Sequence, residues 1–443
     1  MFKLNRAIYL AAVLALCACK SDDTKTTDAK QPGTDAVQDG PIATGDGARD
    51  APGEAARDAA GDTVPPQCSG ATPTTTTAGP SSSTPAVTVA QGFTMASIAA
   101  ISNPRQLVAL PNGDLLVGTS GNAVYLIPNA EADGQPGAPM PFASVNDAPV
   151  QGVAFDASTC TIYVASQHGI YATSYADGQT SAQLGQPIAK VRQVTQGGHT
   201  TTSVAFAGGT LYAGVGSSCN ACTETDPTRA TVQRLDPDGA NMSTRAKRIR
   251  NAIALTVNPA TGSVWAGVAG QDGLPSGHPY EFFDPITAHA GVADYGWPAC
   301  EEDQHAYISG SDCSSTVIPR VEMPAYSTII GAVFYPLAPS GKHAFPQSYR
   351  GGAFLAAHGS WHKVGGKFFS PPRVAFVAMN GDTPAIPVDW SDPTKQWTDF
   401  VSGFELADGL TRLGRPTGIA VGREGSLFIA DDHANRVYRV RPQ

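Results

Sequence analysis

The chain has 443 residues, of which only 15% are charged, and it contains 47 glycines and 35 prolines. This turn-rich composition argues against coiled coils, helical bundles and collagen, and it favours a β protein. The formal net charge of −9 argues against a phosphate-backbone partner, which proteins usually meet with a basic patch. We therefore expect no nucleic-acid binding.

The N-terminus has the pattern of an export signal. Lys3 and Arg6 precede an apolar run over residues 7–16, which is shorter than the roughly 20 residues that span a bilayer. The run ends in Leu-Cys-Ala-Cys, which resembles the lipobox of bacterial lipoproteins and predicts lipidation of Cys19. Lipidation of Cys17 and an ordinary cleaved signal are the alternatives. We expect an exported protein, periplasmic or in the outer membrane, that is attached through an N-terminal lipid anchor.

Residues 20–86 are expected to form a disordered linker. The segment consists mainly of Asp, Ala, Gly, Thr, Ser and Pro, so it has too few large apolar side chains to offset the entropy of ordering. The predicted organisation is therefore a lipoprotein signal over residues 1–19, a linker over 20–86 and a folded domain over 87–443.

Six cysteines remain after the signal, and an even number predicts disulfides in an exported protein. A redox or metal-binding role for Cys219-Asn-Ala-Cys222 is the alternative, but no second cysteine or histidine pair at zinc spacing accompanies it. Six cysteines allow fifteen pairings. The short-loop pairs, and the pair left by elimination, are Cys219–Cys222, Cys300–Cys313 and Cys68–Cys160.

A small apolar strand, a turn with Gly or Asn and a second apolar strand recur along the chain at a spacing typical of propeller blades. Six copies predict an all-β fold, a six-bladed β-propeller; a β-sandwich is the alternative, but it does not need one motif six times. Residues 87–98 are expected to add an outer strand to the last blade. The copies lie at residues 107–118, 152–165, 204–213, 253–267, 331–357 and 418–430.

Polar residues recur just before the first strand of a copy or just after the second. Because these strands are antiparallel, such positions meet at one mouth of the channel. A lone arginine or histidine there is explained by a salt bridge or a backbone hydrogen bond, but several cations at one mouth favour a small polyanionic ligand. The residues are Arg105, Gln151, His199, Arg250, Asn251 and Arg415 before first strands, and Ser217, Ser218, Gln271, Asp272, His358, Asp431 and Asp432 after second strands.

Nine short motifs, in the same order, resemble the soluble glucose and sorbosone dehydrogenase family, including the pyranose dehydrogenase propellers that use pyrroloquinoline quinone (PQQ). The resemblance covers residues 102–440. The motifs are Asn-Pro-Arg105, Gly-His199-Thr, Val215 to Cys222 with Asp226 to Arg229, Ile-Arg250-Asn251, Asp294 to Pro298, Tyr349 to Ala353, His358-Gly-Ser-Trp361, Gly-Arg415-Pro and Ala-Asp431-Asp432.

The resemblance implies that PQQ, with three carboxylates and an ortho-quinone, binds at the mouth together with calcium. His199 is implied to take the hydroxyl proton of the substrate, and Arg250 to stabilise the charge that develops on the quinone oxygen. Calcium is implied to bridge the cofactor and the loop of Gln271, Asp272 and Leu274. The implied cofactor contacts, together with Gln151 at the same mouth, are Arg105, Arg250, Asn251, His358 and Arg415.

Three features depart from the family pattern. Ser217 and Ser218 stand where glucose-oxidising relatives place an acid, which leaves Asp226 as the candidate support for His199. His362 stands where relatives often have asparagine. No Cys-x-x-Cys-His motif occurs, so electrons are expected to leave to an external acceptor, a quinone or a cytochrome.

The predicted function is that of an exported quinoprotein dehydrogenase that oxidises a sugar or related alcohol. A non-catalytic, calcium-stabilised propeller that binds glycans or a surface partner is the alternative. A lactone hydrolase is a third interpretation, but it requires carboxylates that converge on a channel metal. Trp297, Trp361 and Tyr326 are candidates for a sugar-stacking platform, although we expect the tryptophans to pack between blades.

Overall fold

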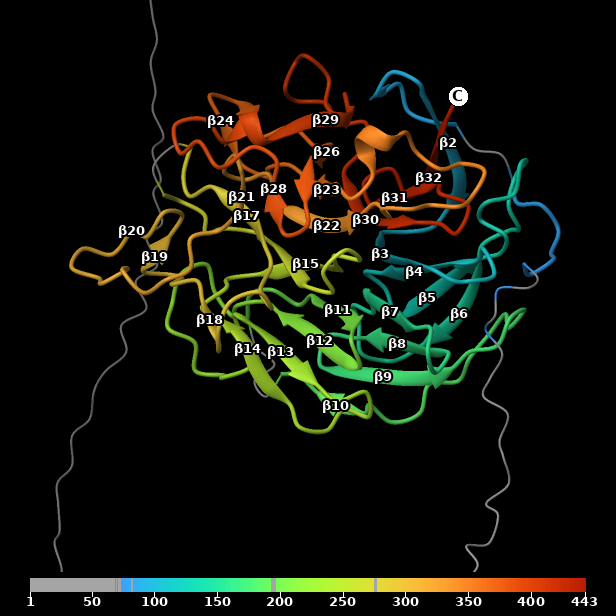
Figure 1. The fold of residues 1–443 in the computed structure, drawn as a ribbon, viewed down its shortest axis with the longest axis horizontal. Coiled ribbons are helices and arrows are strands. Elements are labelled where there is room, and N and C mark those ends of the chain that lie inside the picture. Colours follow the sequence, from blue (N-terminus) through green and yellow to red (C-terminus); the bar gives the residue numbers. More distant parts are fainter. Residues whose placement is uncertain (1–67, 69, 71–72, 81–82, 193–196, 275–276) are drawn as a thin grey trace, which may run out of the picture. The chain divides into compact units, whose positions relative to one another are not determined.

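Six sheets, each with four main strands that pair antiparallel, surround a central channel in the computed structural model of the protein (Figure 1). The structure describes residues 68, 70, 73–80, 83–192, 197–274 and 277–443. The innermost strand of each sheet contacts the innermost strands of its two neighbours, and the sixth contacts the first. The prediction of an all-β, six-bladed propeller is therefore confirmed. The inner strands are β3 (Pro104–Ala109), β7 (Gly152–Asp156), β11 (Thr202–Ala207), β15 (Ala252–Val257), β22 (Ile329–Phe334) and β30 (Pro416–Val421).

Each inner strand is followed in the chain by a second strand that pairs with it antiparallel. These second strands contain mainly buried Leu, Ile, Val and Ala, which pack against the neighbouring blades. The strands are β4 (Leu115–Thr119), β8 (Thr161–Ala165), β12 (Thr210–Val215), β16 (Val264–Val268), β23 (Ala353–Ala357) and β31 (Leu427–Asp431).

A third and a fourth strand complete each blade. The third strands are β5 (Ala123–Ile127), β9 (Gly169–Ser174), β13 (Thr231–Leu235), β17 (Glu281–Asp284), β26 (Arg373–Val377) and β32 (Arg436–Pro442). The fourth strands are β6 (Met140–Ser144), β10 (Ala189–Lys190), β14 (Ser243–Lys247), β21 (Val321–Met323), β29 (Trp397–Ser402) and β2 (Phe93–Ala100).

Shorter elements decorate these blades. Within the described residues, neither short helix is long and apolar enough to cross a bilayer. The additional strands are β1 (Thr88–Val89), β18 (Ala293–Asp294), β19 (Cys300–Glu301), β20 (His305–Ala306), β24 (Lys363–Val364), β25 (Lys367–Phe368), β27 (Met379–Asn380) and β28 (Thr383–Pro384), and the helices are η1 (Gln347–Tyr349) and η2 (Pro393–Gln396).

The ring is closed by the first long strand of the domain. Strand β2 pairs antiparallel with β32, so the last blade joins both ends of the folded chain. This confirms the expected closing strand, but the preceding strand β1 pairs with β29 of the fifth blade. The predicted segment therefore covers the edges of two blades, which protects both from pairing with another chain.

Close packing of the inner strands brings the ends of neighbouring blades together at the mouth. A Cβ atom on Gly331 would lie 1.9 Å from the carbonyl oxygen of Thr417, and one on Gly418 would lie 2.0 Å from that of Arg105. Only glycine fits at these two contacts. Residues from all six inner strands line a channel cavity of about 280 Å³.

The last part of the expected linker packs on the propeller. Cys68 forms a disulfide with Cys160 in the turn between β7 and β8, and buried Thr74 donates to Asp114 in the turn between β3 and β4. These turns lie at the opposite ends of the inner strands from the mouth, so the segment runs over the opposite face. Residues 20–86 are thus not a linker throughout, because a disulfide and buried hydrogen bonds hold the C-terminal part. Cys19 and the predicted signal lie outside the described residues.

The structure also pairs Cys219 with Cys222 and Cys300 with Cys313. These are the short-loop pairs that the spacing predicted. The Cys219–Cys222 disulfide follows strand β12 at the mouth, whereas Cys68–Cys160 lies at the opposite face. The two bonds therefore constrain different faces of one domain.

Candidate active site at the channel mouth

One half of the mouth is built by blades one, five and six. Arg105 on β3 and His358 after β23 both contact Asp432, which follows β31. The Asp432 carboxylate lies 2.6 Å from Arg105 Nη1 and 2.8 Å from His358 Nε2. Burial raises the pKa of Asp432, but the hydrogen bond from His358 and the charges of Arg105 and Arg415 lower it to about 2. Asp432 is therefore ionised and joins the two cation-forming side chains directly.

Among the described residues, the guanidinium of Arg415 in the same half makes no ion pair with a carboxylate, although its backbone amide donates to Asp431 Oδ1 (2.9 Å). Its Nε donates to the carbonyl oxygen of His358 (3.0 Å) and its Nη2 to that of Gly359 (2.8 Å). Burial lowers the pKa of Arg415 to about 10, so the guanidinium stays charged at neutral pH. Carbonyl acceptors orient this charge without neutralising it.

His199 lies in the other half, built by blades three and four. The hydroxyl of Ser217 donates to the carbonyl oxygen of Cys219 (2.7 Å), and its oxygen is 3.0 Å from His199 Nδ1. Because that hydroxyl hydrogen is used, Ser217 accepts from a protonated Nδ1. This arrangement leaves the lone pair on Nε2, which is the nitrogen that can accept a proton.

A neutral hydroxyl thus supports His199 where sequence reasoning offered Asp226. The Asp226 carboxylate instead accepts hydrogen bonds from the amide (2.9 Å) and hydroxyl (2.7 Å) of Thr228. Burial, followed by the charge of Arg250, lowers the pKa of His199 to about 4. The ring is therefore neutral near pH 7, the state that a general base requires.

Two buried arginines hold the backbone of His199. The carbonyl oxygen of His199 accepts from Arg192 Nη1 (2.7 Å) and Arg229 Nη2 (2.8 Å). Arg229 also donates to the carbonyl oxygens of Gly216 (3.1 Å) and Ser217 (2.9 Å). Two charged donors therefore fix this position, and residues 193–196 lie outside the described residues.

Arg250 is the buried cation of this half. Its Nε donates to the carbonyl oxygen of Asn220 (3.0 Å), its Nη1 to that of Ala269 (3.2 Å) and its Nη2 to the Asn220 side-chain oxygen (2.9 Å). The nearest carboxylate oxygen, on Asp272, lies 3.3 Å away. Burial raises the pKa of Glu281 and Glu301 nearby to about 8, so these acids add little negative charge at neutral pH.

Asn251 and Gln151 complete the polar lining. Gly216 lies between Asn251 and His199, and only glycine fits there. A Cβ at this position would lie 2.4 Å from Asn251 Oδ1 and 2.6 Å from His199 Cβ. Gln151 is 3% exposed, and among the described residues its Oε1 has no hydrogen-bond partner. A small cavity at this end of the channel is lined by Arg105, Gln151 and the first residues of the other inner strands.

The predicted calcium loop lies beside Arg250. Gln271 donates to the carbonyl oxygen of Pro298 (3.2 Å), and Asp272 accepts at its own carbonyl from Asn220 Nδ2 (2.7 Å). Leu274 is half-buried at the end of the described part of the loop. Over the described residues, the only cluster of three metal-ligating side chains is Cys219, Cys222 and Glu224, and its cysteines form a disulfide. The described side chains of residues 271–274 therefore do not form a cluster of metal ligands.

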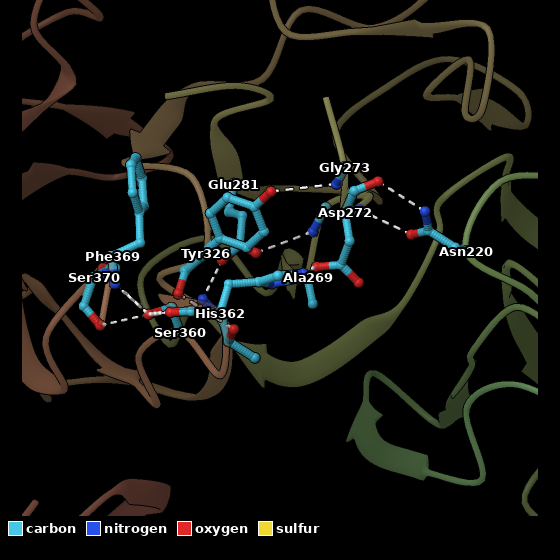
Figure 2. A network of polar contacts seen from close by, with 12 residues as sticks. Asn220, Ala269, Asp272, Gly273, Glu281, Tyr326, Ser360, His362, Phe369 and Ser370 are labelled. Carbon is cyan, nitrogen blue, oxygen red and sulfur yellow. Dashed lines mark hydrogen bonds and ion pairs between the residues drawn. The ribbon is translucent and has the colours of Figure 1, made fainter. Parts of the chain in front are cut away.

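The aromatic candidates separate into buried and exposed groups. Trp297 is 3% exposed and packs in the domain, as expected, whereas Trp361 is 66% exposed at the mouth. The expectation that Trp361 packs between blades is wrong, because the loop after β23 carries it outward onto His362, with ring centroids 3.7 Å apart. His362 also contacts Tyr326, with ring centroids 4.7 Å apart, and its Nδ1 lies 3.6 Å from Asp272 Oδ1; Figure 2 labels all three residues.

Sequence reasoning placed the cations at one mouth but missed how they are held. The anion expected to join them is partly replaced by Asp432 and Asp272, which the repeat phase had also placed at the mouth. The sequence alone did not indicate a role for Asn220. The one signal for it was the position of Cys219-Asn-Ala-Cys222 after a second strand.

The comparisons with known proteins agree with this architecture. A family model described as TrAA12-like matches residues 87–279 and 289–443. The chain belongs to the TrAA12-like family. A curated relative, an uncharacterised protein of Borreliella burgdorferi, is 26% identical over 196 residues, or 43% of this chain and 47% of that protein. That match spans about half the relative's length.

Solved structures share the fold of this TrAA12-like chain at low identity. The calcium structure of the Trichoderma reesei carbohydrate-active enzyme of family AA12 has a TM-score of 0.66 and 19% identity, covering 83% of this chain and 100% of that one. The holo form of the PQQ domain of pyranose dehydrogenase from Coprinopsis cinerea has a TM-score of 0.65 and 17% identity, covering 83% of this chain and 100% of that one. The soluble aldose sugar dehydrogenase of Escherichia coli has a TM-score of 0.57 and 16% identity, covering 79% of this chain and 100% of that one. The expected family resemblance is confirmed.

Proposed function

We propose that this protein is an exported quinoprotein dehydrogenase that oxidises a sugar or a related alcohol with PQQ and calcium. The observation that carries the proposal is the coexistence, at one mouth, of a neutral, half-buried histidine and two arginines held mainly by carbonyl groups. The protein's structural neighbours include the PQQ domain of a pyranose dehydrogenase and an aldose sugar dehydrogenase, and these support a sugar dehydrogenase.

The donor set of the mouth fits a small polycarboxylate. Arg105, Arg250 and Arg415 offer guanidinium donors, which bind carboxylates strongly, and Gln151 adds a buried acceptor without a described partner. Asn251 and His358 line the same mouth. When bound there, PQQ would supply an ortho-quinone able to accept a hydride. Backbone carbonyls of residues 271–274 would be the protein's ligands to calcium, which prefers oxygen.

His199 is assigned the role of general base. Its Nδ1 proton is committed to Ser217, so Nε2 accepts the hydroxyl proton of the substrate as the carbon–hydrogen bond breaks. Arg250 stabilises negative charge that develops on the acceptor oxygen. Charges of Arg250, Arg192 and Arg229 disfavour the protonated ring, which returns the proton to solvent after turnover.

Several parts of the proposal concern the whole protein. We infer that Cys19 carries a lipid anchor, that the protein is periplasmic or in the outer membrane, and that a quinone or a cytochrome takes the electrons. The physical basis is the charged and apolar leader, the even number of cysteines after it and the lack of a haem-binding motif in the sequence.

A titration of the full-length protein with PQQ at excess calcium tests the proposal, with tryptophan fluorescence or heat as the signal. We expect saturable, stoichiometric binding that is lost in Arg415→Ala. Arg234→Ala is the matched control, because Arg234 is exposed on β13 and donates to Ser243. Binding should be followed by oxidation of sugars with an artificial dye acceptor.

A non-catalytic propeller is the second candidate. The observation in its favour is that Asp432 already joins Arg105 and His358, so part of the mouth is balanced by the protein itself. No PQQ binding by the folded protein would contradict the dehydrogenase proposal and would favour this module, which glycan-array binding can then test.

A further inference from the structure

Asn220, in the loop closed by the Cys219–Cys222 disulfide, is the residue of that loop that contacts Arg250. The two cysteines are three positions apart, and the loop directly follows strand β12. The carbonyl oxygen of Asn220 accepts from Arg250 Nε (3.0 Å) and from the indole nitrogen of Trp297 (3.1 Å). The main chain of this loop therefore binds a candidate cofactor arginine.

The side chain of Asn220 makes three further hydrogen bonds. Its Oδ1 accepts from Arg250 Nη2 (2.9 Å) and from the Asp272 amide (2.8 Å), and its Nδ2 donates to the Asp272 carbonyl oxygen (2.7 Å). Figure 2 shows the paired contacts between Asn220 and Asp272. One amide group thus joins Arg250 to the backbone of the loop that follows β16.

The same loop reaches the proposed base. Cys219 accepts from the Ser217 hydroxyl, whose oxygen supports His199 Nδ1. On the far side of the 270–274 loop, the Gly273 amide donates to the Tyr326 hydroxyl (3.2 Å). The 270–274 loop is therefore held from two sides, and the disulfide loop is the side that also contacts Arg250 and the support of His199.

We propose that Asn220 is a positioning residue for Arg250 and Asp272, and that the Cys219–Cys222 disulfide holds it in place. A disulfide across so short a loop constrains the unfolded chain less than one that closes a longer loop, whereas Asn220 within it contacts Arg250 and Asp272 directly. Groups that orient ligand-binding residues typically change affinity or activity by about 10- to 100-fold when they are removed. The part of this inference that concerns cofactor affinity rests on the proposed function, whereas the part that concerns the loop does not.

The first test is amide hydrogen exchange of the full chain without any ligand. In Asn220→Ala, the Asp272 amide loses its acceptor, so we expect exchange there to accelerate by at least about 10-fold. The double variant Cys219→Ser/Cys222→Ser should show the same acceleration. Asn220→Asp retains a side-chain acceptor for the amide and for Arg250, so slow exchange at Asp272 should be restored.

The second test is PQQ affinity at excess calcium in the same variants. We expect Asn220→Ala and the Cys219/Cys222 double variant to bind about 10- to 100-fold more weakly, and Asn220→Asp to recover part of the loss. The matched control is Cys68→Ser/Cys160→Ser, which removes the disulfide of the opposite face. It should lower thermal stability more and leave both the Asp272 exchange and the affinity unchanged.

Two outcomes separate the inference from the proposed function. Unchanged exchange at Asp272 in folded Asn220→Ala overturns the positioning role, whatever the protein binds. Accelerated exchange in a protein that binds no PQQ supports the positioning role and contradicts the dehydrogenase proposal.

The control variant tests the disulfide separately. An equal loss of affinity in the Cys68/Cys160 control overturns the local role of the Cys219–Cys222 disulfide.

Discussion

The two halves of the channel mouth carry similar residues but balance their charges differently. In the half with Arg105 and His358, Asp432 lies 2.6 and 2.8 Å from the two side chains. In the half with Arg250, carbonyl and amide oxygens hold the guanidinium and the nearest carboxylate oxygen is 3.3 Å away. In the first half, Asp432 joins Arg105 and His358 directly, and Arg415, held by carbonyl oxygens, keeps its charge. In the second half, Arg250 has only the longer contact with Asp272, and its positive charge is available to a ligand or a reaction.

This difference explains why one histidine suits chemistry and the other does not. His358 Nε2 contacts Asp432, so the nitrogen is already used. His199 uses Nδ1 on Ser217 and keeps Nε2 for a substrate. Burial lowers the pKa of both rings to about 4, so the two rings differ in their partners, an ionised carboxylate for His358 and a neutral hydroxyl for His199, and not in basicity.

The largest expected effect is on turnover. If His199 is the base, His199→Gln should lower kcat by about 100- to 10,000-fold, the range for loss of a general base, with PQQ affinity close to wild-type. His358→Gln, in the other half, should weaken PQQ binding more than it lowers kcat. Steady-state kinetics with a dye acceptor and a PQQ titration measure the two effects. Equal losses of kcat in both variants would contradict the functional division of the mouth.

The next largest effect is on stability, in the opposite half. Asp432→Asn leaves Arg105 and His358 without their shared carboxylate, and we expect the free energy of unfolding to fall by about 2–4 kcal/mol, near the range for a broken buried pair. Asp272→Asn should cost about 1 kcal/mol or less, because its contact with Arg250 is longer and Asp272 is 25% exposed. Chemical denaturation of the two variants measures the difference. A larger loss of unfolding free energy in Asp272→Asn than in Asp432→Asn would contradict the view that Asp432 is the stronger structural ion pair.

The pH dependence of activity sharpens the same comparison. A base must be neutral, so kcat/KM should stay level from neutral pH down to about pH 5 and fall as pH approaches the His199 pKa of about 4. Burial is the main cause of the lowered pKa and the charge of Arg250 is the second. In Arg250→Gln the acid limb should therefore move to higher pH, whereas in Arg105→Gln it should stay in place. An unmoved limb in Arg250→Gln would contradict the coupling.

The two histidines should also make the free energy of unfolding depend on pH. The pKa values of both histidines are lower in the folded protein, about 4, than their ordinary value of 6.5. At these two histidines the unfolded chain therefore binds more protons between pH 6.5 and 4, so their contribution to stability should fall as pH falls through that window. Glu281 and Glu301, whose pKa values are raised to about 8, contribute in the opposite direction, so the histidine contribution is the difference in slope between wild-type and the histidine variant. His358→Gln should flatten the decrease. Denaturation midpoints at pH 7 and 4.5 provide the measurement.

Much of the fold could be predicted because it repeats. The six strand pairs and the polar residues at their ends follow from periodicity. Contacts between distant segments do not: the pair of Arg105 and Asp432 joins residues 327 positions apart, and no repeat states which carboxylate neutralises which cation. The role of Asn220 depends on a turn of the disulfide loop toward Arg250, which spacing alone does not determine.

The exposed aromatic rim provides the smallest predicted effect. If Trp361, 66% exposed beside His362, stacks against a sugar ring, Trp361→Ala should raise KM by about 2- to 10-fold, the size of one aromatic contact. PQQ affinity and stability should change little, because few of its atoms are buried. Leu337→Ala is the control, since Leu337 is 54% exposed at the opposite face after β22. A KM unchanged by Trp361→Ala would place sugar recognition deeper in the mouth, within reach of His199 and Arg250, and would leave the rim without a part in it.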